Sequence, residues 1–339
     1  MENYKTISIA MATYNGEKYI QQQLESLEKQ KYKPIEVIIC DDCSNDRTIE
    51  ICNNFSKKSS LIIKVIKNNT KLGFIENFFK AASLCSGDLI AFCDQDDVWE
   101  NDKLERAQKS FFDSKIAIFG HASKLITEKG NIIGHHGLSL QSGTYSIADL
   151  DPWDLVYGFS IVIKRSVWNS VDPNDRPTDP FCRTEKLSHD RWAYFLGTAV
   201  GSMAYDAQPL ARYRQHGKNV FGSNKSRKNR ILERLHLISI DRGNYINLLF
   251  QASNTMSKIS ESFSNRELDI NKSPSFIYYN LSQKYKNRLS IFSNNKPCSI
   301  LKFLRCLING SYQEKNTKNK YKEILCDFIY IFIKNKKII

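Results

Sequence analysis

Residues 89–99 read LIAFCDQDDVW. The first five are apolar, which is typical of a strand buried on both faces of a sheet. They lead directly into an acidic loop formed by Asp94, Gln95, Asp96 and Asp97. Three carboxylates in four residues repel one another, so a cation or a ligand must offset their charge. Mg²⁺ and Mn²⁺ prefer carboxylate and phosphate oxygens, so the stretch predicts a metal site; the alternative is an acidic loop that only caps a helix near Asp102.

The sequence before this stretch alternates between strand and helix patterns. Apolar runs predict further strands over residues 7–13, 35–40 and 61–66, and helical spacing of apolar residues predicts helices over 17–30, from about 46, and over 73–84. Repeated βαβ units of this kind form a doubly wound sheet. We therefore expect an α/β fold, with a doubly wound mixed sheet flanked by helices.

The patterns after residue 100 are weaker. They predict a helix from Asn101 to Phe112 and short strands over 116–120 and 158–163. Gly, Pro and Asp punctuate residues 130–154 and 172–183, which predicts loops there. From Asn229 onward the pattern is helical and basic, with a break rich in Ser and Asn between residues 260 and 275.

Polar side chains stand at the ends of three predicted strands. The first strand delivers Thr13, Tyr14 and Asn15, the second Asp41 and Asp42, and the fourth the acidic loop. Doubly wound sheets bind ligands outside the carboxyl ends of their strands, so these side chains predict a site at one edge. An Asp there can accept hydrogen bonds from a pyrimidine N3–H or from ribose hydroxyls. The alternative for Asp41 and Asp42 is an ordinary turn and helix cap.

Two histidine-containing segments are further candidates. In His189-Asp190-Arg191-Trp192, the flanking Trp and His can desolvate Asp190 and prepare it as a general base. Taken alone, such a pair is more often structural. His216 is isolated in its segment, and a metal-binding role needs the acidic loop as its partner.

Charge is unevenly distributed along the chain of 339 residues. The net charge is +13, and residues 223–339 contain 22 Lys and Arg against 8 Asp and Glu, a net of +14. This basic region is typical of a dock for a membrane surface or a nucleic acid, the alternative being a solvated helical surface. A hydrophobic content of 41% excludes a fully disordered chain.

The nine cysteines are scattered, mostly in apolar runs, which indicates buried thiols in a reducing compartment. Cys40 and Cys43 have CxxC spacing, but no second pair or nearby His completes a zinc site. The first apolar run is too short for a secretory signal, and no stretch approaches the ~20 apolar residues of a spanning helix. We therefore expect a cytoplasmic protein, peripheral on the cytoplasmic face of the membrane.

Several motifs together resemble a known family across roughly residues 5–222. In order, they are Met11–Gly16, Asp41–Thr48, Asn68 and Asn69, Gly73 and Asn77, Ser86–Asp88 and Asp94–Asp97. They resemble the ordered motifs of the family 2 glycosyltransferases, which have the GT-A fold. Within that family, the segments Gly158–Arg165, His189–Trp192 and Tyr213–Val220 resemble bacterial rhamnosyltransferase-like members that build surface polysaccharides.

The resemblance implies roles for individual residues. It implies that Thr13 and Asp42 contact the nucleotide base with Asp41 nearby, and that Asp94 contacts the ribose or the metal. It further implies that Asp96 and His216 hold Mg²⁺ or Mn²⁺ on the donor diphosphate, and that Asp190 is the general base. The expected nucleotide-sugar site is completed by Tyr14, Asn15, Asn77 and Gln95, and the acceptor side by Asp97, Trp99, Gly158, Arg191, Trp192 and Arg214. Cys43 departs from the family, which usually has Gly or a small residue there.

The function implied is an inverting transfer of a sugar, with rhamnose from dTDP-rhamnose as the first candidate and UDP-hexoses next. The expected acceptor is a hydroxyl of a lipid-linked oligosaccharide. We expect a catalytic domain over residues 1–222, divided near residue 100 into nucleotide-sugar and acceptor halves, and a basic helical region over 223–339 that anchors on the membrane surface. The alternatives are a nucleotide-sugar-binding protein without turnover, and a nucleic-acid binder that uses the basic region. The oligomeric state is open.

Overall fold

The computed structural model describes residues 4–150, 156–179, 185–217, 274–292 and 296–309, and the isolated positions 254, 257–258, 311–312, 324–325, 327–328 and 331. By their contacts the residues form two compact units. The first comprises residues 1–175 and 188–222, and the second comprises residues 176–187 and 223–339.

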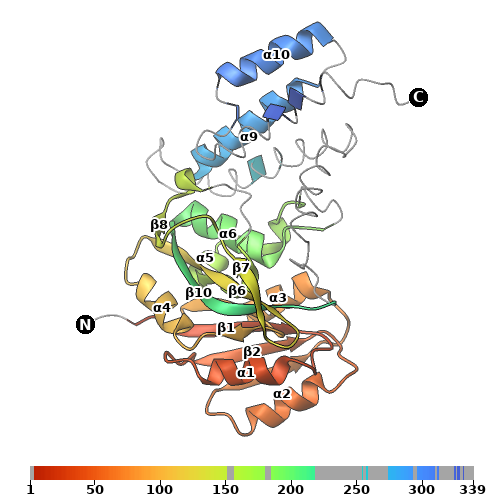
Figure 1. Cartoon of the computed structure of the whole chain (residues 1–339), viewed down its shortest axis with the longest axis vertical. Helices are drawn as coiled ribbons and strands as arrows, with labels where there is room; N and C mark the ends of the chain where they lie inside the picture. Colours follow the sequence, from red (N-terminus) through yellow and green to blue (C-terminus); the bar gives the residue numbers. More distant parts are fainter. Residues whose placement is uncertain are drawn as a thin grey trace. The chain divides into compact units, whose positions relative to one another are not determined.

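A ten-stranded sheet forms the centre of the first unit, with the order β3-β2-β1-β4-β9-β6-β10-β5 and with β7 and β8 paired to β6 and β10 (Figure 1). The strands are β1 (Ile7–Thr13), β2 (Glu36–Asp41), β3 (Ile63–Lys67), β4 (Leu89–Asp94), β5 (Val98–Trp99), β6 (Ile116–Thr127), β7 (Ile132–His136), β8 (Gly143–Tyr145), β9 (Val162–Lys164) and β10 (Ser202–Gln215). Strands β1 to β4 are parallel, and so are β6 and β10, whereas β9 runs antiparallel to β4 and β6. The sheet is therefore mixed, as predicted.

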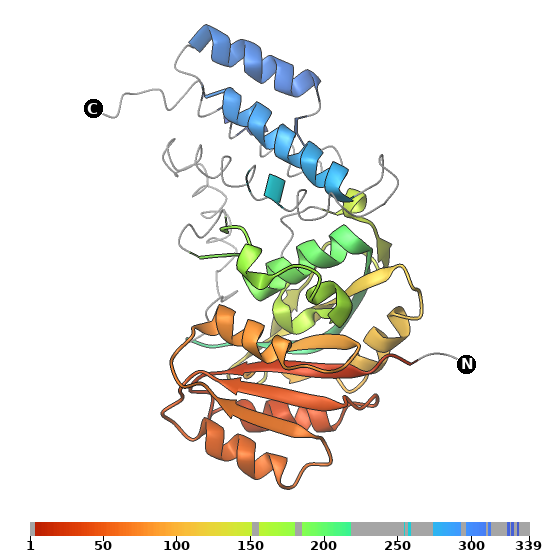
Figure 2. The same ribbon diagram turned by 180° about the vertical axis from the view of Figure 1, so that it is seen from behind.

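Helices cover both faces of this sheet. They are α1 (Ile20–Glu28), α2 (Thr48–Ser56), α3 (Phe74–Ser83), α4 (Lys103–Ser110), α5 (Arg165–Trp168) and α6 (His189–Val200), with 3₁₀ turns η1 (Ile147–Asp149), η2 (Gly158–Ser160) and η3 (Pro173–Asp175). Apolar side chains of α1, α2 and α4 share one core with alternate residues of β1, β2 and β4. On the opposite face α3 packs against β1 and β2, and α5 and α6 pack together (Figures 1 and 2). This arrangement confirms the doubly wound fold.

Several sequence predictions after residue 112 were incomplete or wrong. Residues 130–154, predicted as loop, contain β7 and β8. The side chains of these strands are largely exposed, so their sequences lack the apolar pattern of a buried strand. They form because they pair with the longer strands β6 and β10. The strand predicted over 116–120 continues to Thr127. The strand predicted over 158–163 starts only at Val162, because residues 158–160 form η2. Helix α6 and strand β10 were not predicted at all.

In the second unit, the structure describes two longer helices, α9 (Pro274–Ser290) and α10 (Lys296–Ile308). A buried ion pair joins Arg288 Nε of α9 to Asp327 Oδ2 at 3.0 Å, and the Tyr312 hydroxyl donates to the same oxygen at 2.9 Å. Asp327 interrupts the apolar run of residues 324–333 in the basic region. It has polar partners inside this unit. Helices α9 and α10 agree with the helical pattern predicted after the break at residues 260–275. The part of that pattern over residues 229–253 lies outside the described residues. Among the described residues, no helix combines the length and apolar character needed to cross a membrane.

Glu36, the first residue of β2, is a buried carboxylate that links three parts of the first unit. It accepts hydrogen bonds from Ser8 Oγ at 2.8 Å and from the Ser86 amide at 2.7 Å, and it pairs with Lys64 Nζ at 2.8 Å. Burial by itself raises the pKa of Glu36, but the bonds from Lys64, Ser86 and Ser8 outweigh it and lower that pKa to about 2.

We expect Glu36→Gln to lower the free energy of unfolding by about 2–3 kcal/mol at pH 7. Because the folded-state pKa lies below the usual 4.5, the stabilisation is present above pH 4.5 and is lost as the pH falls towards 2. Urea unfolding at several pH values measures this. Glu50→Gln is the matched control, since Glu50 pairs with Arg47 on the surface and should show no measurable change. Wild-type and Glu36→Gln curves that stay parallel between pH 5 and pH 2 would contradict the assignment.

Candidate functional site at the carboxyl edge of the sheet

The polar strand ends meet at one edge of the sheet, as the sequence predicted. Thr13 of β1 lies beside Asp41 of β2, and the preceding residue of β1, Ala12, lies beside Asp94 of β4. Strand β10 is parallel to β6 and brings Arg214 and Gln215 to the same edge. Its antiparallel pairing with β5 places these residues beside the acidic loop.

Arg214 holds the acidic loop in position. Its side chain is 2% exposed, and its Nε donates to the Asp96 carbonyl at 2.9 Å. Its amide nitrogen donates to Asp97 Oδ1 at 2.9 Å, and Nη1 donates to the Glu128 carbonyl at 2.8 Å. Arg214, predicted on the acceptor side, thus uses its guanidinium on backbone oxygens and on Gln22 Oε1, and it fixes where the loop carboxylates lie.

Asp96 and His216 form a close pair across 120 residues of sequence. Asp96 Oδ2 lies 2.7 Å from His216 Nε2. The His216 ring stacks on the Tyr19 ring with ring centres 5.0 Å apart. The Arg214 guanidinium lies 4.9 Å from the centre of the Tyr19 ring. Tyr19 and Arg214 therefore orient the imidazole towards the acidic loop.

Asp94 carries an uncompensated carboxylate. No hydrogen bond to this carboxylate is found within the described part of the chain. Burial, together with the charges of Asp96 and Asp190, raises the pKa of Asp94 to about 8. The influence of Asp190 shows that the first turn of α6 lies close to the acidic loop.

Asp190 has one oxygen fixed and one oxygen available. Its Oδ1 accepts hydrogen bonds from Ser188 Oγ and, at 2.7 Å, from the Arg191 amide. Its Oδ2 makes no hydrogen bond within the described ranges. Asp190 lies in the first turn of α6, whose backbone fixes the position of its side chain. The arrangement suits a carboxylate that accepts a proton.

His189, next to Asp190, points away from this charge cluster into an aromatic environment. Its ring stacks on Phe78 with centres 3.9 Å apart and lies 5.1 Å from the ring of Phe92. Gly158 faces the same ring, since a Cβ there would lie 2.2 Å from His189 Nε2. Gly158 is thus required by close packing beneath the start of α6.

The two aspartates after β2 are already engaged by protein groups. Asp41 accepts hydrogen bonds from Thr13 Oγ1 at 2.9 Å and from the Ser44 amide at 2.8 Å. Asp42 accepts from the amides of Leu72 at 2.6 Å and Gly73 at 2.8 Å, and from Asn68 Nδ2 at 3.0 Å. Both are buried, so they shape the turn after β2 and the entry to α3.

The turn after β2 contains Cys43 in the left-handed conformation, with φ of 65°. A glycine adopts this conformation without strain, which accounts for the small residue usual at this position. The Cys43 thiol donates to the Asn68 carbonyl at 3.3 Å. The thiols of Cys40 and Cys43 are both free, and burial raises the pKa of Cys40 to about 11.

Gln95 ties the acidic loop to the end of β1. Its side-chain amide exchanges two hydrogen bonds with the backbone of Tyr14, each 3.0 Å long. Asn15, with φ of 47°, accepts a bond from the Asn45 amide at 3.0 Å. Asn77 donates to the Cys40 carbonyl at 2.7 Å and is buried. Of this group, Tyr14 is the exposed member, at 41%, with Lys71 Nζ 3.8 Å from its ring centre.

Three residues predicted on the acceptor side lie in the protein interior. Trp99 is 2% exposed, Trp192 is 1% exposed and Asp97 is fully buried. Burial raises the pKa of Asp97 well above its usual range, with added contributions from Asp96 and Asp94. Large aromatic side chains contribute most when buried, so the structure places these tryptophans in the core and not on the wall of the site. The exposure of Arg191 is intermediate.

Sequence reasoning assigned no role to Lys103, Tyr157 or Tyr213, although Tyr213 begins one of the segments that carry the family resemblance. Lys103 is fully buried in α4, its Nζ lies 3.1 Å from the Trp99 ring centre, and it donates to the Phe159 carbonyl. Burial lowers the pKa of Lys103 well below its usual range. Tyr157 and Tyr213 lie with ring centres 5.3 Å apart, and burial together with the charges of Asp190 and Asp94, respectively, raises their pKa values. The local sequence around these residues shows no pattern that predicts their burial beside charged groups.

A divalent cation fits the chemistry of these side chains. Asp96 and His216 supply an oxygen and a nitrogen ligand. Burial and then the charges of Asp96 and Asp190 disfavour ionised Asp94, and a cation would offset both effects. Within the described ranges, no cluster of three or more His, Cys, Asp or Glu side chains is arranged to hold a metal ion. Mg²⁺ and Mn²⁺ commonly take few protein ligands and complete their shells with phosphate oxygens and water. The residues present therefore fit a cation that binds together with a diphosphate.

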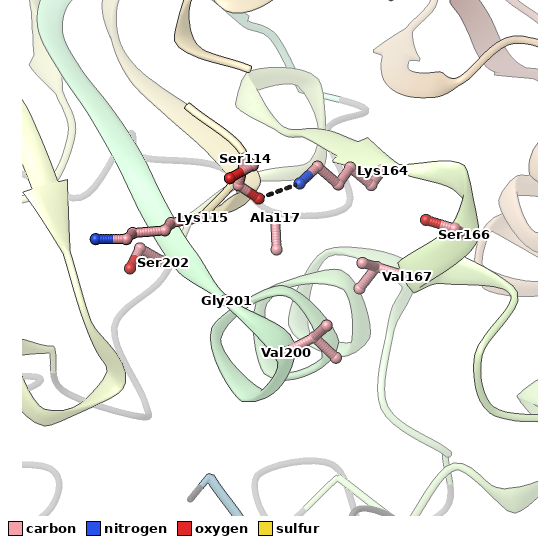
Figure 3. A pocket seen from close by; sticks show the side chains of 9 residues that line it. All are labelled: Ser114, Lys115, Ala117, Lys164, Ser166, Val167, Val200, Gly201 and Ser202. Carbon is pink, nitrogen blue, oxygen red and sulfur yellow. Dashed lines mark hydrogen bonds between the residues drawn. The ribbon is translucent and has the colours of Figure 1, made fainter. Parts of the chain in front are cut away.

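A pocket lies at the opposite edge of the sheet, and its lining residues differ in charge from the acidic loop (Figure 3). This pocket, of about 420 Å³, lies where β6 and β10 begin and β9 ends, and Lys115, Lys164 and Ser202 are among its lining residues. Lys164 Nζ donates to the Ser114 carbonyl at 2.8 Å, as Figure 3 shows. None of the described residues that line the pocket is a carboxylate, so it is separate in place and in charge from the acidic loop.

Comparisons with known proteins agree with this geometry. The family model described as glycosyl transferase family 2 matches residues 8–169. A dTDP-rhamnosyl transferase of Shigella flexneri is 30% identical over 232 residues, which cover 64% of this chain and 75% of that protein. A UDP-Glc:alpha-D-GlcNAc-diphosphoundecaprenol beta-1,3-glucosyltransferase of Escherichia coli is 38% identical over 128 residues, covering 38% of this chain and 49% of that protein. The crystal structure of S. aureus TarS 1-349 in complex with UDP superposes with a TM-score of 0.55 at 16% identity, covering 96% of this chain and 91% of that one, which shows a shared fold.

Proposed function

Because this chain belongs to the family 2 glycosyltransferases, we propose that it transfers a sugar, with inversion, from a nucleotide diphosphate donor to a hydroxyl of a lipid-linked oligosaccharide. The first candidate donor is dTDP-rhamnose, which the similarity to the Shigella flexneri rhamnosyl transferase supports. The lipid-linked acceptor is supported by the name of the Escherichia coli relative, which acts on a diphosphoundecaprenol substrate.

The observation that carries the proposal is the convergence of Asp190 with the acidic loop. Asp94 ends β4, His216 follows β10 and Asp190 lies in α6. Nevertheless Asp96 of the acidic loop contacts His216, and the charges of Asp96 and Asp190 both act on Asp94. One end of this cluster suits a diphosphate with its cation, and the other offers a carboxylate oxygen free to accept a proton. A protein that only binds nucleotide sugars has no need for the second group.

The chemistry is a single displacement at the anomeric carbon. The acceptor oxygen forms a bond to that carbon while the bond to the diphosphate oxygen breaks, and the nucleoside diphosphate leaves with the electron pair. Asp190 Oδ2 takes the acceptor proton. A bound Mg²⁺ or Mn²⁺ would neutralise negative charge on the leaving diphosphate. Gln95 and Arg214 hold the loop in place, so the reacting groups need little reorganisation.

We propose that the nucleotide lies along the ends of β1 and β2. Tyr14 offers an exposed ring there, and Thr13, Asp41, Asp42 and Asn77 define the shape of the adjoining turns. In this proposal residues 1–222 carry the chemistry. The basic region 223–339 keeps the enzyme peripheral on the cytoplasmic face of the membrane. Nucleic-acid binding is disfavoured at the carboxyl edge, because its carboxylates repel phosphates unless a metal is present.

A donor panel tests the proposal. Full-length protein is incubated with dTDP-rhamnose, UDP-glucose or UDP-GlcNAc and Mn²⁺ or Mg²⁺, and release of nucleoside diphosphate is measured with and without EDTA. We expect release from one donor, lost in EDTA. Metal-dependent donor binding without release would instead support the binding protein without turnover. No release and no metal-dependent binding would overturn the proposal.

A further inference from the structure

One side of helix α10 is buried in the protein, and a second side, made of apolar residues, is exposed to solvent. Ser299, Phe303 and Cys306 are buried, as expected for the side that packs within the second unit. A second set of apolar side chains is exposed to solvent by 37% to 85%. These residues, called here the aliphatic stripe, are Ile300, Leu301, Leu304, Leu307 and Ile308.

The aliphatic stripe is continuous along the helix. With 3.6 residues per turn, its five residues fall within an arc of roughly 120° on one side of α10. Arg305 is exposed and lies about 40° beyond one edge of this arc, whereas Lys302 lies further round, next to the buried Cys306. Single exposed apolar residues are ordinary on protein surfaces, but a contiguous aliphatic stripe marks a surface that binds something.

The charge of the region selects the partner. Residues 223–339 contain 22 Lys and Arg against 8 Asp and Glu, and Lys286 of the neighbouring α9 is exposed as well. An aliphatic face flanked by basic residues is the pattern of a helix that lies in the interface of a membrane with anionic headgroups. Contact between two copies of this surface would bring like charges together, which is unfavourable.

We propose that the aliphatic stripe of α10 docks the protein on an anionic lipid surface. Its aliphatic side chains enter the boundary between headgroups and acyl chains, and Arg305 at the edge of the stripe contacts the headgroup phosphates. The helix lies parallel to the membrane, since its 13 residues are too few to span it. The proposal is consistent with a lipid-linked acceptor, but it rests on α10 alone and is measured without any sugar.

Vesicle co-sedimentation of the full chain tests this docking surface. The vesicles contain phosphatidylcholine with or without phosphatidylglycerol. We expect wild-type protein to bind the anionic vesicles, and Leu301→Gln/Leu304→Gln to weaken that binding by about tenfold or more. Arg305→Gln should bind more weakly and with less sensitivity to salt. Ile62→Gln/Leu84→Gln is the matched control, because it removes two exposed aliphatic residues from the first unit and should bind like wild type.

Equal binding by wild type and the stripe variant would overturn the proposal, as would an absence of binding by wild type. Size-exclusion chromatography with light scattering tests whether a second copy of the chain is the partner instead. If wild type is a dimer and the stripe variant is a monomer, a second copy covers α10. Circular dichroism confirms that each variant is folded. The docking surface and the transferase proposal can fail separately. If the stripe variant loses vesicle binding while wild type uses no donor, the docking surface is upheld and the transferase proposal is rejected.

Discussion

Asp190→Asn is expected to lower kcat by about 10³-fold, within the range usual for loss of a general base. The change is nearly isosteric, and Asn can keep the hydrogen bonds that Oδ1 accepts from Ser188 and the Arg191 amide. What it removes is the basicity of Oδ2, the oxygen proposed to take the acceptor proton. Donor affinity should stay near the wild-type value, because the diphosphate is bound at the acidic loop.

Steady-state kinetics with the donor identified by the panel measures this effect, and donor titration by calorimetry measures affinity. Glu105→Gln is the matched control: Glu105 also lies in the first turn of a helix, α4, where it pairs with Lys109 on the surface. Its kcat should be unchanged. If Asp190→Asn kept the wild-type kcat, another group would have to accept the proton.

The parts of the site that sequence could predict are those set by short-range pattern. The apolar runs before Thr13, Asp41 and Asp94 identified strands, and parallel pairing brings the ends of such strands to one edge. The two aspartates after β2 could equally be interpreted as turn residues, and their bonds to backbone amides in the structure agree with that local chemistry.

The remaining parts depend on contacts between distant segments. Asp96 and His216 are 120 residues apart, and only the family resemblance suggested that they meet. The role of Arg214 depends on carbonyl oxygens that the sequence does not mark as acceptors. Strand β10 was missed because exposed residues and Pro209 interrupt its apolar pattern, yet it is held by a long parallel pairing with β6. Trp99 and Trp192 were expected on the acceptor side because their motifs suggested it, whereas packing places them in the core.

Asp96→Ala is expected to abolish the metal dependence of nucleotide binding and to lower kcat/KM by about 10²–10³-fold. Asp96 offers the carboxylate that lies 2.7 Å from His216 Nε2, so its removal deletes one of the two proposed protein ligands. The loss of this carboxylate reduces the attraction of the site for a divalent cation.

Calorimetric titration with a nucleoside diphosphate, in Mn²⁺ and in EDTA, measures this dependence directly. Wild type should bind more tightly in Mn²⁺, whereas Asp96→Ala should bind equally in both. Asp102→Ala is the matched control, because Asp102 follows the same loop but makes no side-chain cap bond to α4. A variant lacking Asp96 that still binds more tightly in Mn²⁺ would move the cation to Asp94 and leave His216 as a structural partner of the loop.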